Sequence, residues 1–231
     1  MTGHDVFDIE DLFLASLYLW TFDDINDIKN IRGTTWSKRS RSIQSVPGVR
    51  GRAVKTVGEP GSIKISADHR SLLVTPYNTN AVTLALWIYY ESQGPQVTQT
   101  ILAAGDQANG DRGIHLYQAD GSVEELTFEI KSAFKLCVAK FRVSQRIWTQ
   151  LVFMWTRYNH ATIYRNGESI TDLSNHCHSG DFVDLYDNAI TIGSTSLPKA
   201  SFDDLILWKV KLSKTQVEKL YRYYMGKCSK L

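Results

Sequence analysis

Four aspartates stand in two adjacent pairs that are far apart in the sequence. Asp23 and Asp24 follow an apolar segment that ends at Phe22, and Asp203 and Asp204 lie at the start of another apolar segment. Carboxylates that converge repel one another unless a cation neutralises them, and Ca²⁺, which takes about six to eight oxygen ligands, suits such a site. Because side chains alternate along a strand, one member of each pair should face inward. We favour Asp23 and Asp204, with Asp203 as a lesser candidate. The alternative is that these aspartates cap turns or accept hydrogen bonds from backbone amides.

A basic segment directly follows an acidic one. Residues 28–55 contain eight Lys or Arg side chains and no acid, whereas residues 5–27 contain seven acids and no Lys or Arg. The sequence WSKRSR in the basic segment predicts an exposed basic loop, whose Lys38, Arg39 and Arg41 would bind a sulfated glycan or an acidic protein surface. The alternatives are that these charges form a solvated face, or that the two segments attract each other.

The overall charge and the longest apolar stretch exclude two classes of partner. Lys and Arg number 26 against 24 Asp and Glu, a net charge of +2, and no recognition helix or base-stacking motif accompanies the basic segment, so nucleic acid is not expected. Leu12–Trp20 is apolar over only nine residues, about half of what a bilayer span requires, so no membrane insertion is expected. The acidic residues before it are the opposite of a signal peptide's basic start, so we expect no signal peptide within this chain.

The three cysteines predict at most one disulfide bond. Cys137, Cys177 and Cys228 are too few for a disulfide scaffold and lack the spacing of a zinc site. His176 and His178 flank Cys177, but no further Cys/His pair completes a tetrahedral set. The simplest prediction is a bridge between Cys137 and Cys177, with Cys228 free.

The sequence carries no catalytic motif. A glycoside hydrolase on a β-sandwich needs two carboxylates on one face of a strand, about 5 to 5.5 Å apart in a retaining enzyme, as in E-x-D-x-x-E. No such string occurs, and Glu125 and Glu129 lack the middle Asp. G-x-S-x-G, H-E-x-x-H and a phosphate-binding glycine loop are also absent from the sequence. The sequence therefore predicts that the protein is not an enzyme.

The apolar pattern predicts a chain built from strands. Ala81–Tyr90, with the sequence AVTLALWIYY, is largely apolar on both faces, which is typical of a central strand. Asn166-Gly167 predicts a tight hairpin turn. About a dozen short strands separated by turn residues indicate an all-β sandwich or jelly roll. The predicted strands are Leu14–Phe22, Arg52–Val57, Ser62–Ser66, Ala81–Tyr90, Ile101–Ala104, Gly113–Gln118, Glu125–Ser132, Val138–Val143, Trp148–Thr156, Ala161–Arg165, Glu168–Thr171, Ala189–Ile192 and Phe202–Lys209.

A single segment near the C-terminal end has the pattern of a helix. Apolar side chains recur with a 3.6-residue period between Val217 and Met225. Ser213 and Gln216 have the spacing of a capping box, which marks the start of a helix. We therefore predict a helix over Lys214–Met225.

Several motifs occur in an order that is specific for one fold. They are LYLWTFDD at Leu17–Asp24, PGVRGRAV at Pro47–Val54, VTLALWIYY at Val82–Tyr90, WTQLVFMW at Trp148–Trp155, IYRNGESI at Ile163–Ile170, ITIGS at Ile190–Ser194 and the closing segment Ser201–Tyr221. This order resembles the laminin-G-like and pentraxin-like branch of the concanavalin A-like jelly rolls. The resemblance covers nearly the whole chain, with residues 14–231 as the jelly-roll domain and residues 1–13 as an N-terminal extension.

The resemblance has consequences for the aspartates and for the core. In this fold the first and last strands are neighbours, so it implies that Asp23, Asp203 and Asp204 converge, and the family often holds a structural calcium ion near such positions. The core disulfide of true pentraxins would fall at Ala85 and Val152, which are not cysteines. This departure weakens any inference of pentraxin-like assembly or ligand binding.

The resemblance implies a function outside the cell. Members of these families act mostly as adhesion, recognition or receptor ectodomain modules. Our first hypothesis is a non-enzymatic extracellular or cell-surface module that binds a protein or glycan. The second is a lectin or glycoside-processing domain with a sugar cleft on the concave sheet. The third is a homo-oligomerisation domain.

Overall fold

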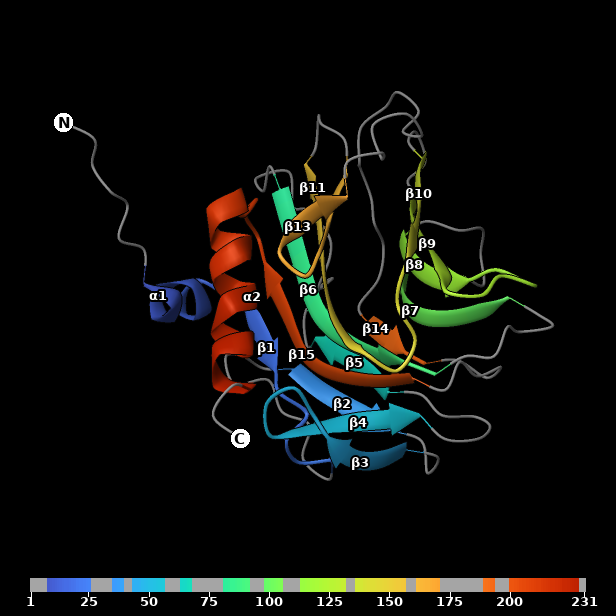
Figure 1. Ribbon diagram of the computed structural model, residues 1–231, viewed down its shortest axis with the longest axis horizontal. Helices are drawn as coiled ribbons and strands as arrows, with labels where there is room; N and C mark the ends of the chain where they lie inside the picture. The colour runs from blue at the N-terminus through green and yellow to red at the C-terminus, as the bar shows by residue number, and fades with distance from the viewer. Residues whose placement is uncertain are drawn as a thin grey trace.

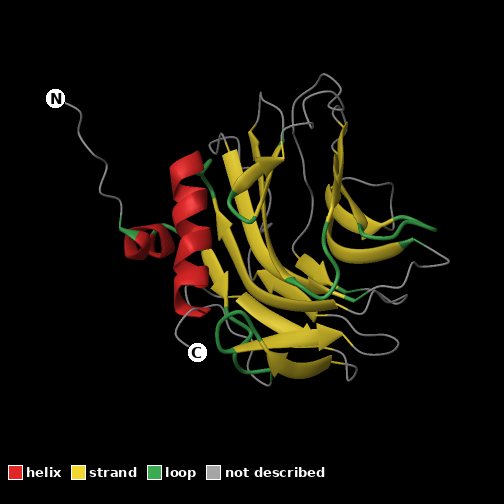
Figure 2. Cartoon of the chain, in the orientation of Figure 1, coloured by secondary structure: helices red, strands yellow, loops and turns green. Residues whose placement is uncertain are grey.

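Two antiparallel β-sheets face each other, and α2 (Lys214–Cys228), the longer of the two described helices, lies on the outer face of one sheet (Figure 1 and Figure 2). The computed structural model describes residues 8–25, 35–39, 43–56, 63–67, 81–91, 98–105, 113–131, 136–156, 161–170, 189–193 and 200–228. Strands dominate these residues, which confirms the predicted all-β sandwich with a short C-terminal helix.

In both sheets, some neighbouring strands come from distant parts of the sequence. The described strands of the eight-stranded sheet are β1 (Tyr18–Trp20), β3 (Ile43–Pro47), β4 (Arg52–Thr56), β6 (Ala81–Tyr90), β11 (Trp148–Thr156), β12 (Thr162–Arg165), β13 (Glu168–Ile170) and β15 (Ala200–Trp208). Their order is β13-β12-β11-β6-β15-β4-β3, with β1 paired to β15. The seven-stranded sheet has the order β10-β9-β8-β7-β14-β5-β2. Its strands are β2 (Thr35–Arg39), β5 (Ile63–Ala67), β7 (Gln99–Gly105), β8 (Gly113–Gln118), β9 (Glu125–Lys131), β10 (Leu136–Arg142) and β14 (Ala189–Ile192).

The central strand β6 is buried on both faces, as its sequence predicts. The even-numbered side chains of β6, from Val82 to Tyr90, lie in the core between the sheets. On the other face, Ala85 and Trp87 belong to a second apolar cluster beneath the helices. The Trp87 ring stacks on Tyr221 of α2, with ring centroids 5.9 Å apart. The molecule therefore has three layers, with the eight-stranded sheet in the middle.

Both described helices pack on the eight-stranded sheet. In α2, the Ser213 hydroxyl accepts a hydrogen bond from the Gln216 N–H and the Gln216 side chain accepts one from the Ser213 N–H, so the predicted capping box is confirmed. The short α1 (Ile9–Leu14) contacts α2, and the Leu12 carbonyl accepts a hydrogen bond of 2.9 Å from the Trp208 indole. Neither of these described helices has the length and apolar character that crossing a bilayer requires.

The two ends of the domain are neighbours in one sheet. Strand β1 pairs with β15, and Trp20 is the register partner of Leu205. This confirms the implied contact between the first and last strands. Ala85 and Val152, the positions of the missing pentraxin disulfide, are direct partners across β6 and β11. Both are buried in the cluster beneath α2, so apolar packing replaces the bridge there.

Two parts of the N-terminal region differ from the predictions. The predicted strand Leu14–Phe22 is shorter in the structure, where β1 covers only Tyr18–Trp20. Helix α1 forms before it, and the Asp8 N–H at the start of this helix donates to the Asp11 carboxylate. The predicted basic loop is in fact partly a strand, since Thr35–Arg39 is the edge strand β2. Backbone pairing with β5 forms this strand without an apolar pattern, and charged residues are common in edge strands.

Only part of the proposed basic ligand site lies within the described backbone. Backbone register places Lys38 opposite Lys64 and Arg39 opposite Ile63, and Arg41 lies outside the described residues. The role of Lys38, Arg39 and Arg41 in ligand binding stays a prediction.

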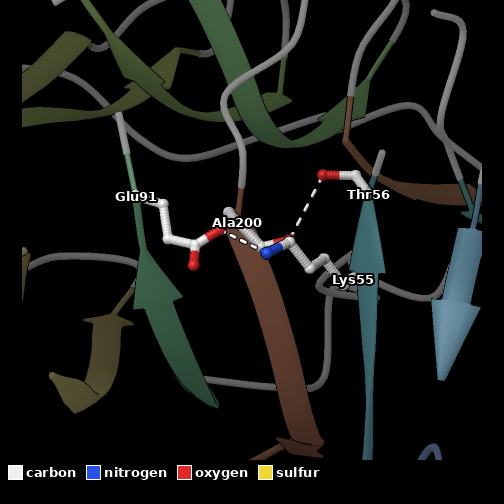
Figure 3. A network of polar contacts seen from close by, with 4 residues as sticks. All are labelled: Lys55, Thr56, Glu91 and Ala200. Carbon is white, nitrogen blue, oxygen red and sulfur yellow. Dashed lines mark hydrogen bonds and ion pairs between the residues drawn. The ribbon is translucent and has the colours of Figure 1, made fainter. Parts of the chain in front are cut away.

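An ion pair between Lys55 and Glu91 ties β4 to the residue after β6 (Figure 3). Next to it, the Thr56 hydroxyl donates a hydrogen bond of 3.2 Å to the carbonyl oxygen of Ala200 on β15. Each charged side chain of the pair is 24 % exposed. These contacts join β6, β15 and β4 at one end of the eight-stranded sheet.

Replacing Lys55 with methionine is expected to lower the free energy of unfolding by about 1 kcal/mol, because Glu91 would keep a partly buried charge without its partner. Glu91→Gln should have a similar effect, and the double variant should lose less than the sum of the two. A double-mutant cycle from urea denaturation measures this coupling. The control is the pair Lys140–Glu125, whose charged atoms are 3.8 Å apart and whose side chains are 63 % and 40 % exposed. Equal coupling at both pairs would contradict the prediction.

Candidate functional site

A β-bulge in β15 places two consecutive aspartates on the helix side of the sheet. The register with β6 shifts between Asp203 and Ile206, and Asp204 has a φ of 43°. Asp203 is the register partner of Trp87, and Asp204 hydrogen-bonds Tyr224 of α2. Only 0 % and 4 % of these two aspartates is exposed. The expectation that one of the pair faces inward is therefore wrong here, because a bulge interrupts strand alternation and re-aims its side chains.

The turn between β3 and β4 donates hydrogen bonds to the carboxylates from both ends of the chain. Asp203 Oδ2 accepts from the N–H groups of Val49, at 2.8 Å, and Arg50, at 3.2 Å. Asp23 Oδ1 accepts from the N–H of Arg52 at 2.8 Å. One oxygen of Asp203 and one oxygen of Asp23 thus accept hydrogen bonds from backbone amides, as the alternative to a calcium site predicts. We call Asp23, Asp203 and Asp204 the acidic cluster.

Two glycines let this turn approach the carboxylates. A Cβ atom on Gly48 would lie 2.4 Å from Asp203 Oδ2. Gly51 has a φ of +70°, and a Cβ atom there would lie 2.1 Å from Asp23 Oδ1. The spacing of glycines in PGVRGRAV is therefore explained by close contact with two carboxylates.

Two tyrosines of α2 cover the cluster. Tyr224 is buried, and its hydroxyl bonds Asp204. Arg50 donates a hydrogen bond to the Tyr223 hydroxyl, and its guanidinium carbon lies 5.0 Å from the centroid of the Tyr223 ring. The turn, the bulge and the helix therefore form one connected unit.

Burial makes the acidic cluster hold a proton. Burial and the charge of Asp204 raise the pKa of Asp203 to about 8, although the N–H groups of Arg50 and Val49 oppose the shift. Burial also raises the pKa of Asp204 to about 7, against the hydrogen bond from Tyr224. Two such coupled carboxylates titrate as a pair, and at neutral pH the pair retains a proton unless a cation replaces it.

Asp203 and Asp204 each have one carboxylate oxygen that could bind a cation, but they supply only part of a metal site. Oδ1 of Asp203 and Oδ1 of Asp204 are buried and have no hydrogen-bond partner among the described residues. Buried acceptors without a partner are unfavourable, so these atoms suit a proton or a metal ion. Within the described ranges, no group of three or more His, Cys, Asp or Glu side chains is arranged to hold a metal ion. A calcium ion here would therefore take its other ligands from backbone carbonyls and water.

A second polar surface lies on the outer face of the seven-stranded sheet. The rings of His115 and Tyr117 on β8 have centroids 4.5 Å apart. His115 Nε2 lies 2.8 Å from Thr100 Oγ1 on β7, and Tyr117 hydrogen-bonds Thr127 on β9. Both rings are half-buried, whereas their sequence neighbours on β8 point into the core. We call this surface the β8 cluster, made of Thr100, His115, Tyr117, Thr127 and Glu129.

The two aromatic groups of the β8 cluster are uncharged at neutral pH. Burial lowers the pKa of His115, so its imidazole is neutral. Burial and the charge of Glu129 raise the pKa of Tyr117, so its hydroxyl keeps the proton. Register places Glu129 opposite His115. Aromatic rings, neutral hydrogen-bonding groups and one carboxylate are the groups that bind the apolar faces and hydroxyls of sugars.

The structure describes one of the two cysteines of the predicted disulfide bond. Cys137 on β10 is buried and disulfide-bonded. Cys177 lies outside the described residues. The pairing of Cys137 with Cys177 therefore stays a prediction.

A family comparison agrees with this architecture. The family model described as the concanavalin A-like lectin/glucanases superfamily, of the laminin G type, matches residues 61–218, more than half of the chain. The chain belongs to this superfamily. The match starts after β4, so the strands that complete the acidic cluster, β1, β3 and β4, come from outside the matched segment.

Solved structures with the superfamily fold include toxin binding domains. The botulinum neurotoxin serotype D binding domain has a TM-score of 0.72 at 14 % identity, over 90 % of this chain and 51 % of that one. The binding domain of Paraclostridial Mosquitocidal Protein 1 also has a TM-score of 0.72 at 14 % identity, over 95 % and 54 %. A serotype D ligand binding domain in complex with N-acetylneuraminic acid has a TM-score of 0.72 at 13 % identity, over 93 % and 52 %. This chain therefore matches about half the length of each, and the likeness shows the fold. No curated protein sequence matches the chain significantly.

Sequence reasoning identified the acidic cluster of this superfamily member but missed its partners and the β8 cluster. In the sequence, Tyr224 belongs only to the apolar pattern between Val217 and Met225, because its hydroxyl meets Asp204 through tertiary contact alone. His115 and Tyr117 could have been found from GIHLYQ, where polar and aromatic side chains alternate with aliphatic ones in a strand.

Proposed function

We propose that this chain is a non-enzymatic recognition module that acts outside the cell and binds a glycan or protein ligand. The observation that carries the proposal is the β8 cluster, in which His115 and Tyr117 present paired aromatic rings on the outer face of a sheet. Hydrogen bonds to Thr100 and Thr127 hold both rings in place. Such pre-organised rings lower the entropy lost when a ligand binds. A glycan is the ligand that this chemistry favours.

Two further facts support the proposal. Several proteins with the same fold are binding domains, and one of them is in complex with N-acetylneuraminic acid. Fold likeness alone is an analogy, so it supports a binding role without naming the ligand. Disulfide bonds persist in oxidising compartments, and Cys137 is disulfide-bonded, which supports an extracellular or cell-surface location.

The glutamates of β9 argue against the glycoside-processing alternative. Glu125 and Glu129 lie on one face of β9, and Thr127 stands between them on that face, where the glycosidase motif has its middle Asp. A hydrolysis assay on each bound glycan tests this alternative, and light scattering tests the homo-oligomerisation hypothesis.

Replacing His115 or Tyr117 with alanine is expected to weaken glycan binding at least about tenfold, because each ring contacts the ligand directly. The measurement is a glycan array followed by calorimetric titration of the strongest glycan. Tyr223→Ala, on α2 at the opposite face of the molecule, is the matched control and should leave affinity unchanged. Full affinity in both β8 variants would place the ligand elsewhere, and hydrolysis of the bound glycan would overturn the non-enzymatic role.

A further inference from the structure

A groove on the helix side of the molecule is lined by α2 and by the turn of the β12–β13 hairpin. Its volume is about 580 Å³, which is within the range of about 300 to 1,000 Å³ typical of pockets for drug-sized ligands. The hairpin contributes Asn166 and Glu168, and α2 contributes Lys214, Glu218 and Tyr221 together with Arg222. None of these residues belongs to the acidic cluster or to the β8 cluster.

The hairpin wall of the groove is held by a tight turn. Asn166 has a φ of 53° and Gly167 a φ of 82°, as the Asn-Gly signal predicts for a hairpin. The Asn166 side-chain oxygen accepts a hydrogen bond of 2.9 Å from the Gln150 N–H, and the Asn166 N–H donates one of 2.9 Å to the Gln150 carbonyl. This wall is therefore anchored to β11 at two points.

The aromatic side chain of the groove is also held in place. The Tyr221 ring stacks on Trp87 of β6, at an interplanar angle of 25°. A Cβ atom on Gly167 would lie 3.3 Å from Tyr221 Cβ, so the turn packs closely against the tyrosine. The part of Tyr221 that stays exposed lines the groove. A ligand would find this aromatic surface already positioned.

The charges along the groove are balanced and weakly paired. Glu218 lies 3.8 Å from Lys214 and 3.9 Å from Arg222, and the two basic side chains are 71 % and 79 % exposed. Exposed ion pairs of this kind contribute about 0 to 1 kcal/mol, so ligand hydroxyls can replace them at little cost. With Glu168 the groove has two acids and two bases. An anionic ligand would meet the two carboxylates, and a cationic ligand would meet the two bases.

The geometry points to a second ligand site in this groove, one that binds a neutral saccharide. A neutral polyhydroxylated ligand satisfies both signs of charge, because its hydroxyls donate to Glu218 and Glu168 and accept from Lys214 and Arg222 in charge-assisted hydrogen bonds. The apolar face of a sugar ring contacts Tyr221. The site is independent of the β8 cluster, so each can fail without the other.

The test is a titration of the isotope-labelled full chain, followed by ¹H–¹⁵N correlation spectra, with cellobiose, lactose and N,N′-diacetylchitobiose, and with a sulfated heparin disaccharide for comparison. We expect at least one neutral saccharide to shift the amides of residues 166–169 and 214–222, with a Kd in the millimolar range. Glu218→Gln and Arg222→Ala should each raise that Kd at least about fivefold, since each removes a charge-assisted hydrogen bond. Arg142→Ala, an exposed arginine on β10 of the other sheet, is the matched control and should leave the Kd unchanged.

Three results would overturn the groove site. One is that no neutral saccharide shifts the groove amides, and another is that the sulfated disaccharide alone does so. The third is an unchanged Kd in both groove variants, whose spectra also show whether they are folded. Shifts confined to the amides around His115 and Tyr117 would overturn the groove while supporting the β8 cluster.

Discussion

Replacing Asp203 with asparagine is expected to stabilise the protein at about pH 9 and to flatten the pH dependence of its free energy of unfolding. Asparagine resembles the protonated aspartate, because its oxygen still accepts from the N–H groups of Val49 and Arg50. It removes one of two adjacent buried charges, so Asp23 is the like-charged neighbour that Asp204 keeps. The effect is large because the exposed fraction of Asp203 is 0 %.

The direction follows from the raised pKa values. In the folded protein the pKa is about 8 for Asp203 and about 7 for Asp204, against an ordinary value of 3.8. Between these values the folded state binds more protons than the unfolded state, so the free energy of unfolding falls as the pH rises. The stabilisation is complete below about pH 4 and is lost above about pH 8, and the loss in the metal-free wild type is on the order of several kcal/mol.

Urea denaturation at acidic, neutral and alkaline pH, in the presence of a chelator, measures this dependence. Asp120→Asn is the matched control, since Asp120 is exposed and lies outside the acidic cluster, and it should leave the slope unchanged. Calcium added at alkaline pH should raise the Tm of the wild type by several degrees, because a ligand of the native state stabilises it, and should have little effect on Asp203→Asn. Parallel pH profiles for wild type and Asp203→Asn would refute the account of the buried pair, and no calcium effect on the wild type would remove the calcium proposal.

Replacing Gly48 with alanine is expected to lower the free energy of unfolding by about 2 to 4 kcal/mol. The new methyl group would lie 2.4 Å from Asp203 Oδ2 and 3.1 Å from the backbone carbon of Arg52. The carboxylate cannot move aside without losing the hydrogen bonds from Val49 and Arg50. Thermal and urea denaturation measure the loss.

Other glycines provide matched controls for this prediction. Gly226→Ala should have a small effect of either sign, because a Cβ atom there meets nothing within 4 Å. Gly51 and Gly121 share a φ of +70°, but only Gly51 lies against a carboxylate. Gly51→Ala should therefore cost more than Gly121→Ala, and Asp23→Ala should remove the difference. A Gly48→Ala variant as stable as the wild type would show that the turn does not press on Asp203.

Elements with a strong local pattern could be predicted from the sequence. The bounds of β6, β8, β11 and β14 agree with the prediction to the residue, and α2 begins at the predicted Lys214. Each has an apolar pattern or a cap that its own residues supply. Strands β2 and β3 and helix α1 were missed, because β2 depends on pairing with β5, β3 on pairing with β4 and α1 on contacts with α2 and Trp208.

The side-chain directions in the acidic cluster could not be predicted from local sequence patterns. The sequence placed Asp23, Asp203 and Asp204 at strand ends, and the resemblance implied that these strands are neighbours. Strand alternation then predicted that one aspartate of each pair faces inward. This failed for Asp203 and Asp204, because the bulge is set by how β15 pairs with β6.

By itself, the sequence determined the fold class, the central strands, the C-terminal helix and the residue types available for a site. These depend on interactions between residues close in the chain and on the period of apolar side chains. Only the tertiary structure decided that Gly48 and Gly51 enclose two carboxylates, that Tyr224 bonds Asp204 and that a groove opens beside Tyr221. The hydrogen bonds that the turn donates to Asp203 join residues 153 and 154 positions apart, and their energies depend on burial, which no local pattern contains.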